Sequence, residues 1–146
     1  VTIGYENNEE ANNSSFTDGW FRTGDQGFFD KDGYLKISGR LKEIINRGGE
    51  KVSPLEIDNV LIEHEAIEQV VTFGVKDKLL GEIIGVALVL KDGFQCTEKE
   101  LKEYARQHLA DFKIPKYICF LEEIPKGATG KLQRIGLADK LGLEKI

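Results

Sequence analysis

One segment near the C-terminus combines glycines with a terminal lysine, a combination suited to binding an anionic group. Residues 125–131 read Pro-Lys-Gly-Ala-Thr-Gly-Lys. Gly127 and Gly130 are expected to take positive φ and to let the backbone approach a ligand closely. Lys131 would then present a compact cation to a phosphate or a carboxylate. The spacing is not that of a phosphate-binding P-loop, because Leu132 follows the lysine, and the local alternative is a solvated turn.

Two further charged residues stand at the ends of predicted strands. Asp25 follows the segment 20–23, and its carboxylate could accept hydrogen bonds from the vicinal hydroxyls of a ribose. Arg40 follows the segment 34–38, and its guanidinium could hold hydroxyls or phosphates. The alternatives are a simple Gly-Asp turn and a loosely paired surface arginine.

A second glycine turn and a boundary complete the set of candidates. Gly48 and Gly49 could let an extended ligand lie against bare backbone, although a β-hairpin turn is the locally favoured interpretation. Lys51 follows them. Lys42 lies where the composition of the chain changes, which is where a hinge would be placed, although alternating charges there also suit a solvated strand.

The elements that must position these residues fall into two regions. Residues 1–40 contain an irregular polar stretch and short strands, with a hairpin expected at Asp32-Gly33. This region has too little apolar surface to fold alone, so we expect it to belong to a larger body. From about residue 41 the pattern is that of a compact α+β unit, a small sheet with helices against it.

The strands of this second region are expected from β-branched runs and its helices from capping patterns. Ser53-Pro54 with Glu56, and Thr97 with Glu100, are typical helix starts. The first helix is expected to reach His64, and the second to carry His108 on its apolar face. Strands are expected at 43–46, 51–53, 70–75, 83–90 and 117–121, and a last helix at 134–141.

Composition excludes several classes of protein. The net charge of −5 over 146 residues disfavours general binding of nucleic acid, and no apolar run approaches the roughly 20 residues of a membrane span. Cys96 and Cys119 are expected to be reduced thiols, without metal-ligand spacing. Both histidines are expected to be packed rather than catalytic. A basic cluster suited to a phosphorylated small molecule is expected from Lys113, Lys116, Lys126, Lys131 and Arg134.

Taken in order, these segments resemble the C-terminal portion of the adenylate-forming superfamily. That superfamily includes acyl-CoA synthetases, coumarate ligases, luciferase and the adenylation domains of peptide synthetases. The resemblance covers the whole chain and rests on three segments in the family's order, WFRTGD, GYLKISGRLKEIINRGGEKVSPLEID and IPKGATGKLQR. GYENNEEAN followed by INRGGEKVSP is most similar to oxalate–CoA ligase-like acyl-CoA synthetases.

The resemblance implies a two-step reaction. A carboxylate attacks the α-phosphate of ATP to give an acyl-adenylate, and coenzyme A then takes the acyl group while AMP leaves. It implies that Asp25, Arg40 and Lys51 face the nucleotide and that Lys131 bridges the substrate carboxylate and the α-phosphate. It also implies that Gly48 and Gly49 line the passage for coenzyme A and that Lys42 is the pivot between half-reactions.

The resemblance also implies that much of the enzyme is absent. Residues 1–40 would be the tail of a large domain, 41–42 the hinge, and 43–146 the mobile C-terminal domain. The acyl pocket and the Mg²⁺ site would lie in the missing N-terminal domain, which is the expected partner, so this chain is expected to be inactive alone. The lack of methionine also suggests a fragment.

Alternatives remain open at this stage. They are an aminoacyl-adenylating or luciferase-like member of the superfamily, and a stand-alone α+β interaction module. Cytoplasmic localisation is expected, with the peroxisome as the alternative, although the final Glu-Lys-Ile is not the Ser-Lys-Leu signal.

Overall fold

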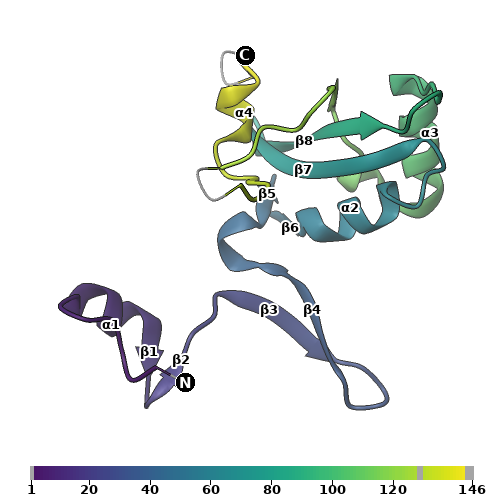
Figure 1. Ribbon diagram of the computed structural model, residues 1–146. Coiled ribbons are helices and arrows are strands. Elements are labelled where there is room, and N and C mark those ends of the chain that lie inside the picture. The colour runs from purple at the N-terminus through teal and green to yellow at the C-terminus, as the bar shows by residue number, and fades with distance from the viewer. Residues whose placement is uncertain (1, 128–129, 144–146) are drawn as a thin grey trace. The chain divides into compact units, whose positions relative to one another are not determined.

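The computed structural model describes residues 2–127 and 130–143 (Figure 1). Contacts within the chain divide it into two compact units, Val1–Lys42 and Glu43–Ile146. A short 3₁₀ turn, Leu41–Glu43, contains the boundary between them.

The N-terminal unit consists of one helix and two antiparallel strand pairs. Strand β1 pairs with β2, and β3 pairs with β4. The β3–β4 pair confirms the hairpin predicted around Asp32-Gly33. The elements are α1 (Glu9–Ser15), β1 (Phe16–Thr17), β2 (Trp20–Phe21), β3 (Asp25–Phe29) and β4 (Leu35–Arg40).

Helix α1 lies in the polar stretch that was expected to be irregular, so that prediction was wrong. The Asn8 side chain caps the helix, because its Oδ1 accepts a hydrogen bond from the Ala11 backbone N–H at 3.0 Å. Glu9 and Glu10 add negative charge to the first turn, where the helix dipole favours it. Local capping here outweighs the low helix propensity of asparagine and serine.

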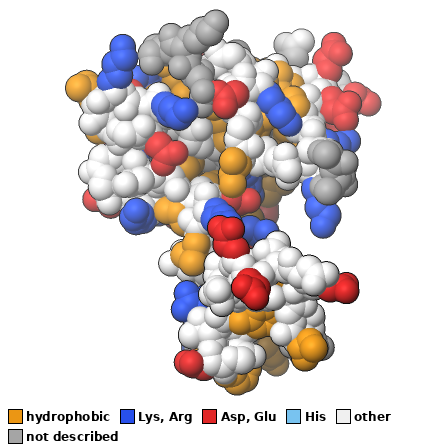
Figure 2. All heavy atoms as spheres, turned by 90° about the vertical axis from the view of Figure 1, so that its left-hand side faces the viewer, with side chains coloured by type: hydrophobic (Ala, Val, Ile, Leu, Met, Phe, Trp, Pro, Cys, Tyr) orange, Lys and Arg blue, Asp and Glu red, His pale blue; other side chains and the backbone are white. Residues whose placement is uncertain are grey.

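The N-terminal unit leaves large apolar side chains in contact with solvent. Trp20 is 80% exposed, Phe29 74% and Tyr34 71%, and none of the buried core residues of the described chain belongs to this unit. Figure 2 shows such side chains, in orange, at the surface of the unit. Exposed aromatic groups at this density are typical of a surface that another protein segment covers.

The C-terminal unit is built on a five-stranded sheet. Its strands are β5 (Ile45–Arg47), β6 (Glu50–Val52), β7 (Ile67–Asp77), β8 (Gly81–Leu90) and β9 (Tyr117–Phe120). The long strand β8 is central, because it pairs with β7 on one edge and with both β5 and β9 on the other. All of these pairings are antiparallel except that of β9, which runs parallel to β8.

Helices cover both faces of this sheet, as Figure 1 shows. Helices α2 (Pro54–Leu61) and α3 (Glu98–His108) bury Ile57 and Leu101 against one face. The short helix α4 (Leu137–Lys140) buries Leu137 against the other. Strand β8 alternates between the two cores, with Ile84 facing the first and Ile83 the second. The α+β class predicted from the sequence is confirmed.

Both predicted helix starts are confirmed in position. For one of them, the predicted capping hydrogen bonds are also present. Thr97 and Glu100 form the complete capping box at the start of α3. Ser53 occupies the N-cap position of α2 without a capping hydrogen bond from its side chain. The Glu56 carboxylate binds Lys113, at 2.6 Å.

Two predicted helices were too long. Helix α2 ends at Leu61 and not at His64, because the chain turns there and begins β7 at Ile67. Helix α4 begins after Gly136, whose φ of 77° is left-handed, so Arg134 lies outside it. No described helix is both long and apolar enough to cross a bilayer.

Candidate functional site

Asp25 and Arg40 are brought together by the β3–β4 hairpin. They are cross-strand partners, and Arg40 Nε lies 3.1 Å from Asp25 Oδ1. The Arg40 side chain is 66% exposed, and an ion pair so open to water holds its members weakly. Both groups can therefore turn from each other to a ligand at little cost.

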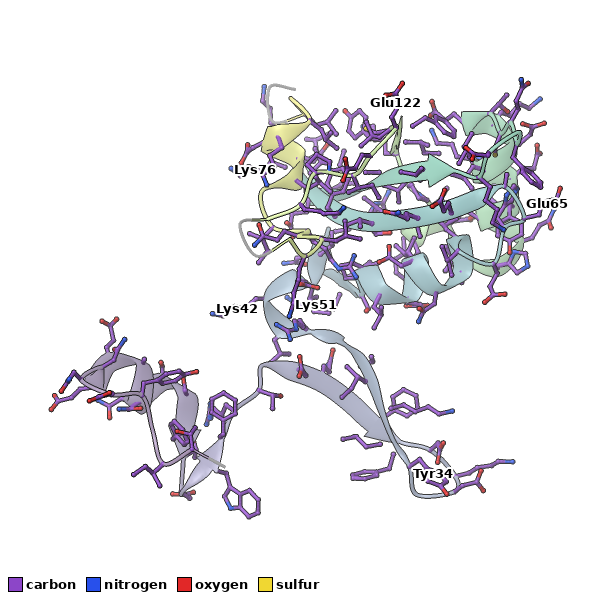
Figure 3. The ribbon with its side chains drawn as sticks, viewed as in Figure 1. Tyr34, Lys42, Lys51, Glu65, Lys76 and Glu122 are labelled. Atoms are coloured by element: carbon purple, nitrogen blue, oxygen red, sulfur yellow. The ribbon has the colours of Figure 1, made fainter. Side chains whose placement is uncertain are left out.

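Lys42 lies in the 3₁₀ turn that follows β4. Its side chain is exposed and projects from the turn, as Figure 3 shows. The first residue of the C-terminal unit, Glu43, comes directly after it.

Gly48 and Gly49 form the two-residue turn between β5 and β6, so the predicted hairpin is confirmed. Their φ angles of 60° and 96° are both left-handed, which side chains rarely tolerate. The Gly48 N–H donates to the Leu80 carbonyl at 2.7 Å. This bond fixes the turn against the β7–β8 connection. Lys51, on β6, is exposed and visible in Figure 3.

Lys131 stands at the end of a tight loop. Lys126 and Leu132 pair as an antiparallel bridge, and the Gly127 N–H donates to the Lys131 carbonyl at 2.8 Å. The Lys131 side chain is exposed. Ala128 and Thr129, in the middle of the predicted loop, lie outside the described residues, as do the last three residues used to weigh the peroxisomal signal.

The two glycines of this loop have different backbone conformations. Gly130 has the expected left-handed φ, at 74°. Gly127 does not, so the positive φ predicted for it was wrong. A Cβ at Gly127 would lie 2.3 Å from the Cδ of Gln133, but this is the end of a flexible, exposed side chain that could move aside, so the local space does not require glycine.

The predicted basic cluster does not form an unpaired cationic patch. Lys113 binds Glu56, Lys126 binds Glu123 at 2.8 Å, and Arg134 binds two carboxylates, so three of the five predicted members are paired with acids of the same unit. Across residues 2–127 and 130–143, no carboxylate pairs with the Lys131 amine. Figure 2 shows the resulting mixture of blue and red side chains on the C-terminal unit.

Arg134 has a role that the sequence did not reveal. Its Nη1 lies 2.7 Å from Asp58 Oδ2 on α2, and its Nε lies 3.0 Å from Glu43 Oε2. The other oxygen of Asp58 accepts the Thr72 N–H at 2.7 Å. Burial raises the pKa of the Asp58 carboxyl, while the Arg134 charge and the Thr72 hydrogen bonds act to lower it. One guanidinium thus joins segments that are 91 residues apart in sequence.

We expect Arg134→Met to lower the free energy of unfolding by about 2–4 kcal/mol at pH 7, because it strands the Asp58 carboxylate in a buried site. Without the arginine, the already raised pKa of Asp58 rises further. The folded variant then takes up a proton that the unfolded chain does not, so its deficit shrinks as the pH falls toward 4. Urea unfolding of the 146-residue chain, followed by far-UV circular dichroism, measures this. Arg134→Met combined with Asp58→Asn should be more stable at pH 7 than Arg134→Met alone, and equal deficits at pH 4 and 7 would contradict the assignment.

The other reactive side chains offer little catalytic chemistry. His64 is half-buried with its ring edge-on to Tyr104, as expected. His108 is exposed on α3, although its ring packs against Tyr104 with 4.4 Å between the ring centroids. Burial raises the pKa of both cysteine thiols, Cys96 and Cys119, which keeps them protonated at neutral pH. Within the described ranges no three acids, histidines or cysteines converge on a point that could hold a metal ion.

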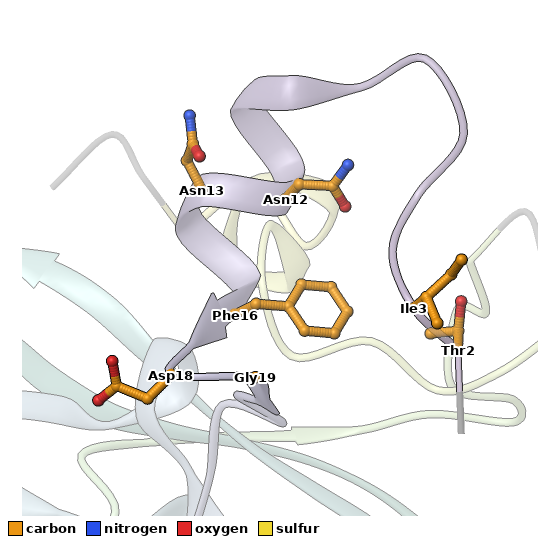
Figure 4. Close-up of a pocket in the computed structure, with 7 residues that line it drawn as sticks. All are labelled: Thr2, Ile3, Asn12, Asn13, Phe16, Asp18 and Gly19. Atoms are coloured by element: carbon orange, nitrogen blue, oxygen red, sulfur yellow. The ribbon is translucent and has the colours of Figure 1, made fainter.

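The N-terminal unit has a separate open hollow of about 720 Å³ beside α1. Figure 4 shows the Phe16 ring pointing into it between α1 and the Thr2–Ile3 segment. The Asn12 amide on its wall already bonds both backbone groups of Tyr5, at 2.6 and 2.8 Å. None of the predicted site residues lines this hollow.

The fold and these segments agree with a known family. Residues 56–131 match the model of the AMP-binding enzyme C-terminal domain. The chain belongs to this family, the C-terminal part of the adenylate-forming superfamily.

Similarity to individual relatives is more specific. The chain is 49% identical over 141 residues to an oxalate–CoA ligase of Saccharomyces cerevisiae, covering 95% of this chain and 26% of that protein. It is 51% identical over 134 residues to an oxalate–CoA ligase of Arabidopsis thaliana, with 92% and 26% coverage. The chain thus spans about a quarter of the length of these relatives.

Solved structures give the same answer. The amide bond synthetase McbA of Marinactinospora thermotolerans matches with a TM-score of 0.87 at 32% identity, over 94% of this chain and 28% of that one. The o-succinylbenzoate–CoA synthetase of Bacillus subtilis, in complex with an acyl-adenylate, matches with a TM-score of 0.80 at 37% identity, over 88% and 26%.

Proposed function

We propose that this chain is the C-terminal part of an ATP-dependent acid–CoA ligase that works by alternation of its C-terminal unit. In the first half-reaction a carboxylate oxygen attacks the α-phosphorus of ATP, and pyrophosphate leaves. In the second, the sulfur of coenzyme A attacks the acyl carbon of the adenylate, and AMP leaves. The partner of this unit is then the ligase's own N-terminal domain.

One observation supports the proposal most strongly: Lys131 is exposed and lacks an acidic partner among the described residues, while Lys126 in the same loop pairs with Glu123. A cation that no internal carboxylate neutralises can place its full charge against an anionic ligand. In an in-line displacement at phosphorus, such a cation stabilises the charge shared by the substrate carboxylate and the α-phosphate. Lys131 is the proposed catalytic residue.

The remaining site residues are assigned to the nucleotide, to coenzyme A and to the motion. Asp25 would accept hydrogen bonds from the ribose hydroxyls. Arg40 and Lys51 would lie near the ribose and the phosphates of the nucleotide. The turn at Gly48 and Gly49, which has no side chains, would line the passage of the pantetheine arm. Lys42 would be the pivot that exchanges the Lys131 loop for this turn between half-reactions.

Several features of the full enzyme are assigned elsewhere. We assign the acyl pocket and the residues that would hold Mg²⁺ with ATP to the N-terminal domain, as the resemblance to the family implies. Oxalate is the first acid to test, because two relatives with about half of their aligned residues identical to this chain carry that name. The structural likeness to an amide bond synthetase makes an amine acceptor the alternative to coenzyme A.

The test uses the full-length protein and the 146-residue chain side by side. We expect the full-length protein to release pyrophosphate from ATP in the presence of oxalate or another small carboxylic acid, and to form a thioester once coenzyme A is added. We expect the 146-residue chain to do neither with the same panel of acids. A full-length protein that forms no acyl-adenylate with any acid would reject the ligase assignment. Turnover by the short chain would reject the division of labour.

A further inference from the structure

The residues of the Lys131 loop that the structure describes have few attachments to the body of the C-terminal unit. It lies between the fully buried side chains of Ile124 and Leu137. Between these two anchors the loop closes on itself, through the bridge of Lys126 with Leu132. Such internal bonds shape the loop but do not fix it to the sheet.

Arg134 supplies the missing attachment. It lies three residues after Lys131, and its side chain is 19% exposed. It reaches α2 through Asp58, which is 11% exposed, and it reaches Glu43, which is 26% exposed. Its Nη1 also points to the Thr72 carbonyl on β7, at a longer 3.5 Å. A planar guanidinium can bridge two carboxylates in this way, whereas an ammonium offers no such fork.

The position of Glu43 gives this network a consequence for motion. Glu43 directly follows Lys42, the proposed pivot, and opens the C-terminal unit. Arg134 therefore joins the first residue after the pivot to the loop that carries Lys131. A rotation at the pivot would therefore move the Lys131 loop together with Glu43.

We propose that Arg134 is a positioning residue, which fixes the Lys131 loop to Glu43 and Asp58 so that the loop and the C-terminal unit move as one rigid body. The inference rests on the proposed function, because it gives Arg134 an effect on one half-reaction only. Adenylate formation needs Lys131 to be held in place. Thioester formation takes place after Lys131 has been withdrawn.

The first test measures the two half-reactions in the full-length ligase. Arg134→Met should lower kcat for adenylate formation by about 10- to 100-fold, as expected from a misplacement of the catalytic group near 1 Å. The KM for ATP should change much less, and thioester formation from a supplied acyl-adenylate should stay within about 3-fold of the parent. Arg134→Lys should restore only part of the rate, because one ammonium cannot hold both carboxylates. Arg106→Met, on the exposed surface of α3, is the matched control and should change neither half-reaction.

The second test does not depend on activity. Hydrogen exchange in the same full-length variants reports the protection of the Gly127 and Gly130 amides, whose bonds close the loop at 2.8 and 2.9 Å. Arg134→Met should speed exchange at these amides by a larger factor than the general loss of protection that its lower global stability causes in β7 and β8.

The outcomes separate this inference from the proposed function. Unchanged protection of the loop in Arg134→Met would overturn the positioning role, whatever the enzyme catalyses. Equal losses in both half-reactions would also overturn it, because they would show a general structural role. A parent protein without adenylating activity would reject the ligase assignment, and the exchange experiment would still decide whether Arg134 holds the loop.

Discussion

Lys131→Ala in the full-length ligase should lower the rate of acyl-adenylate formation by about 100- to 1,000-fold, the usual effect of removing one group that stabilises transition-state charge. The physical reason is that Lys131 has no acidic partner among the described residues, whereas the loop's other lysine, Lys126, pairs with Glu123. Thioester formation from a supplied acyl-adenylate should stay within about 3-fold of the parent. That step breaks the bond between the acyl carbon and the AMP oxygen and leaves the bonds at the α-phosphorus unchanged. Stopped-flow release of pyrophosphate and of AMP measures the two steps separately.

Lys126→Ala is the matched control for this prediction. It removes an exposed lysine from the same loop, five residues away, together with its ion pair to Glu123. Loss of a surface pair is worth about 0–1 kcal/mol, so both half-reactions should be nearly unchanged. If Lys131→Ala slowed both steps equally, or if Lys126→Ala matched its effect, Lys131 would have no specific role in adenylation.

The second large effect is expected at the pivot. Lys42→Pro should slow one half-reaction by about 100-fold and leave the other near the parent rate, because a proline whose fixed φ does not suit one of the two orientations costs about 3 kcal/mol there. Residue 42 lies in a 3₁₀ turn in this structure, and proline suits the φ of such a turn. The orientation with this turn should therefore be the one retained.

Lys42→Ala separates the backbone effect from the charge. It removes the ammonium but leaves φ free, so both half-reactions should proceed at rates within about 3-fold of the parent. A Lys42→Pro enzyme with both half-reactions unchanged would show that the chain does not pivot at this residue. Equal loss of both would indicate damage to the fold, which far-UV circular dichroism would reveal.

Local signals predicted much of the fold. Thr97 and Glu100 specify the start of α3 through bonds that span three residues, and the structure contains all of them. The Gly48-Gly49 hairpin is likewise specified by two residues whose left-handed φ only glycine adopts readily. Errors arose where a second signal competed. Asn8 lies in a polar stretch whose composition predicts irregular structure, yet it caps a helix. Gly136 precedes α4 inside the range 134–141, which the pattern predicts to be helical.

The candidate site was predictable only residue by residue. The pairing of Asp25 with Arg40 depends on the hairpin at Asp32-Gly33 and also on a register shift between Gln26 and Gly27. The register next to the turn would by itself place Asp25 opposite Gly39. The bond of Arg134 to Glu43 joins residues 91 positions apart in sequence. It depends on how α2, β7 and the C-terminal segment pack, so no local sequence pattern predicts it. The expected basic cluster failed for the same reason, because the acids that neutralise Lys113 and Arg134 come from distant elements.

The central claim is that one mobile unit presents Lys131 in the first half-reaction and the Gly48-Gly49 turn in the second. The most direct measurement is the distance between spin labels at Lys31→Cys, in the turn after β3, and Glu65→Cys, in the turn after α2, in a full-length ligase with its native cysteines replaced. Both positions are exposed and outside the proposed site. We predict two distance populations, one favoured by ATP with a non-reactive acid and the other by AMP with coenzyme A. A single distance distribution that neither set of ligands alters would contradict the account.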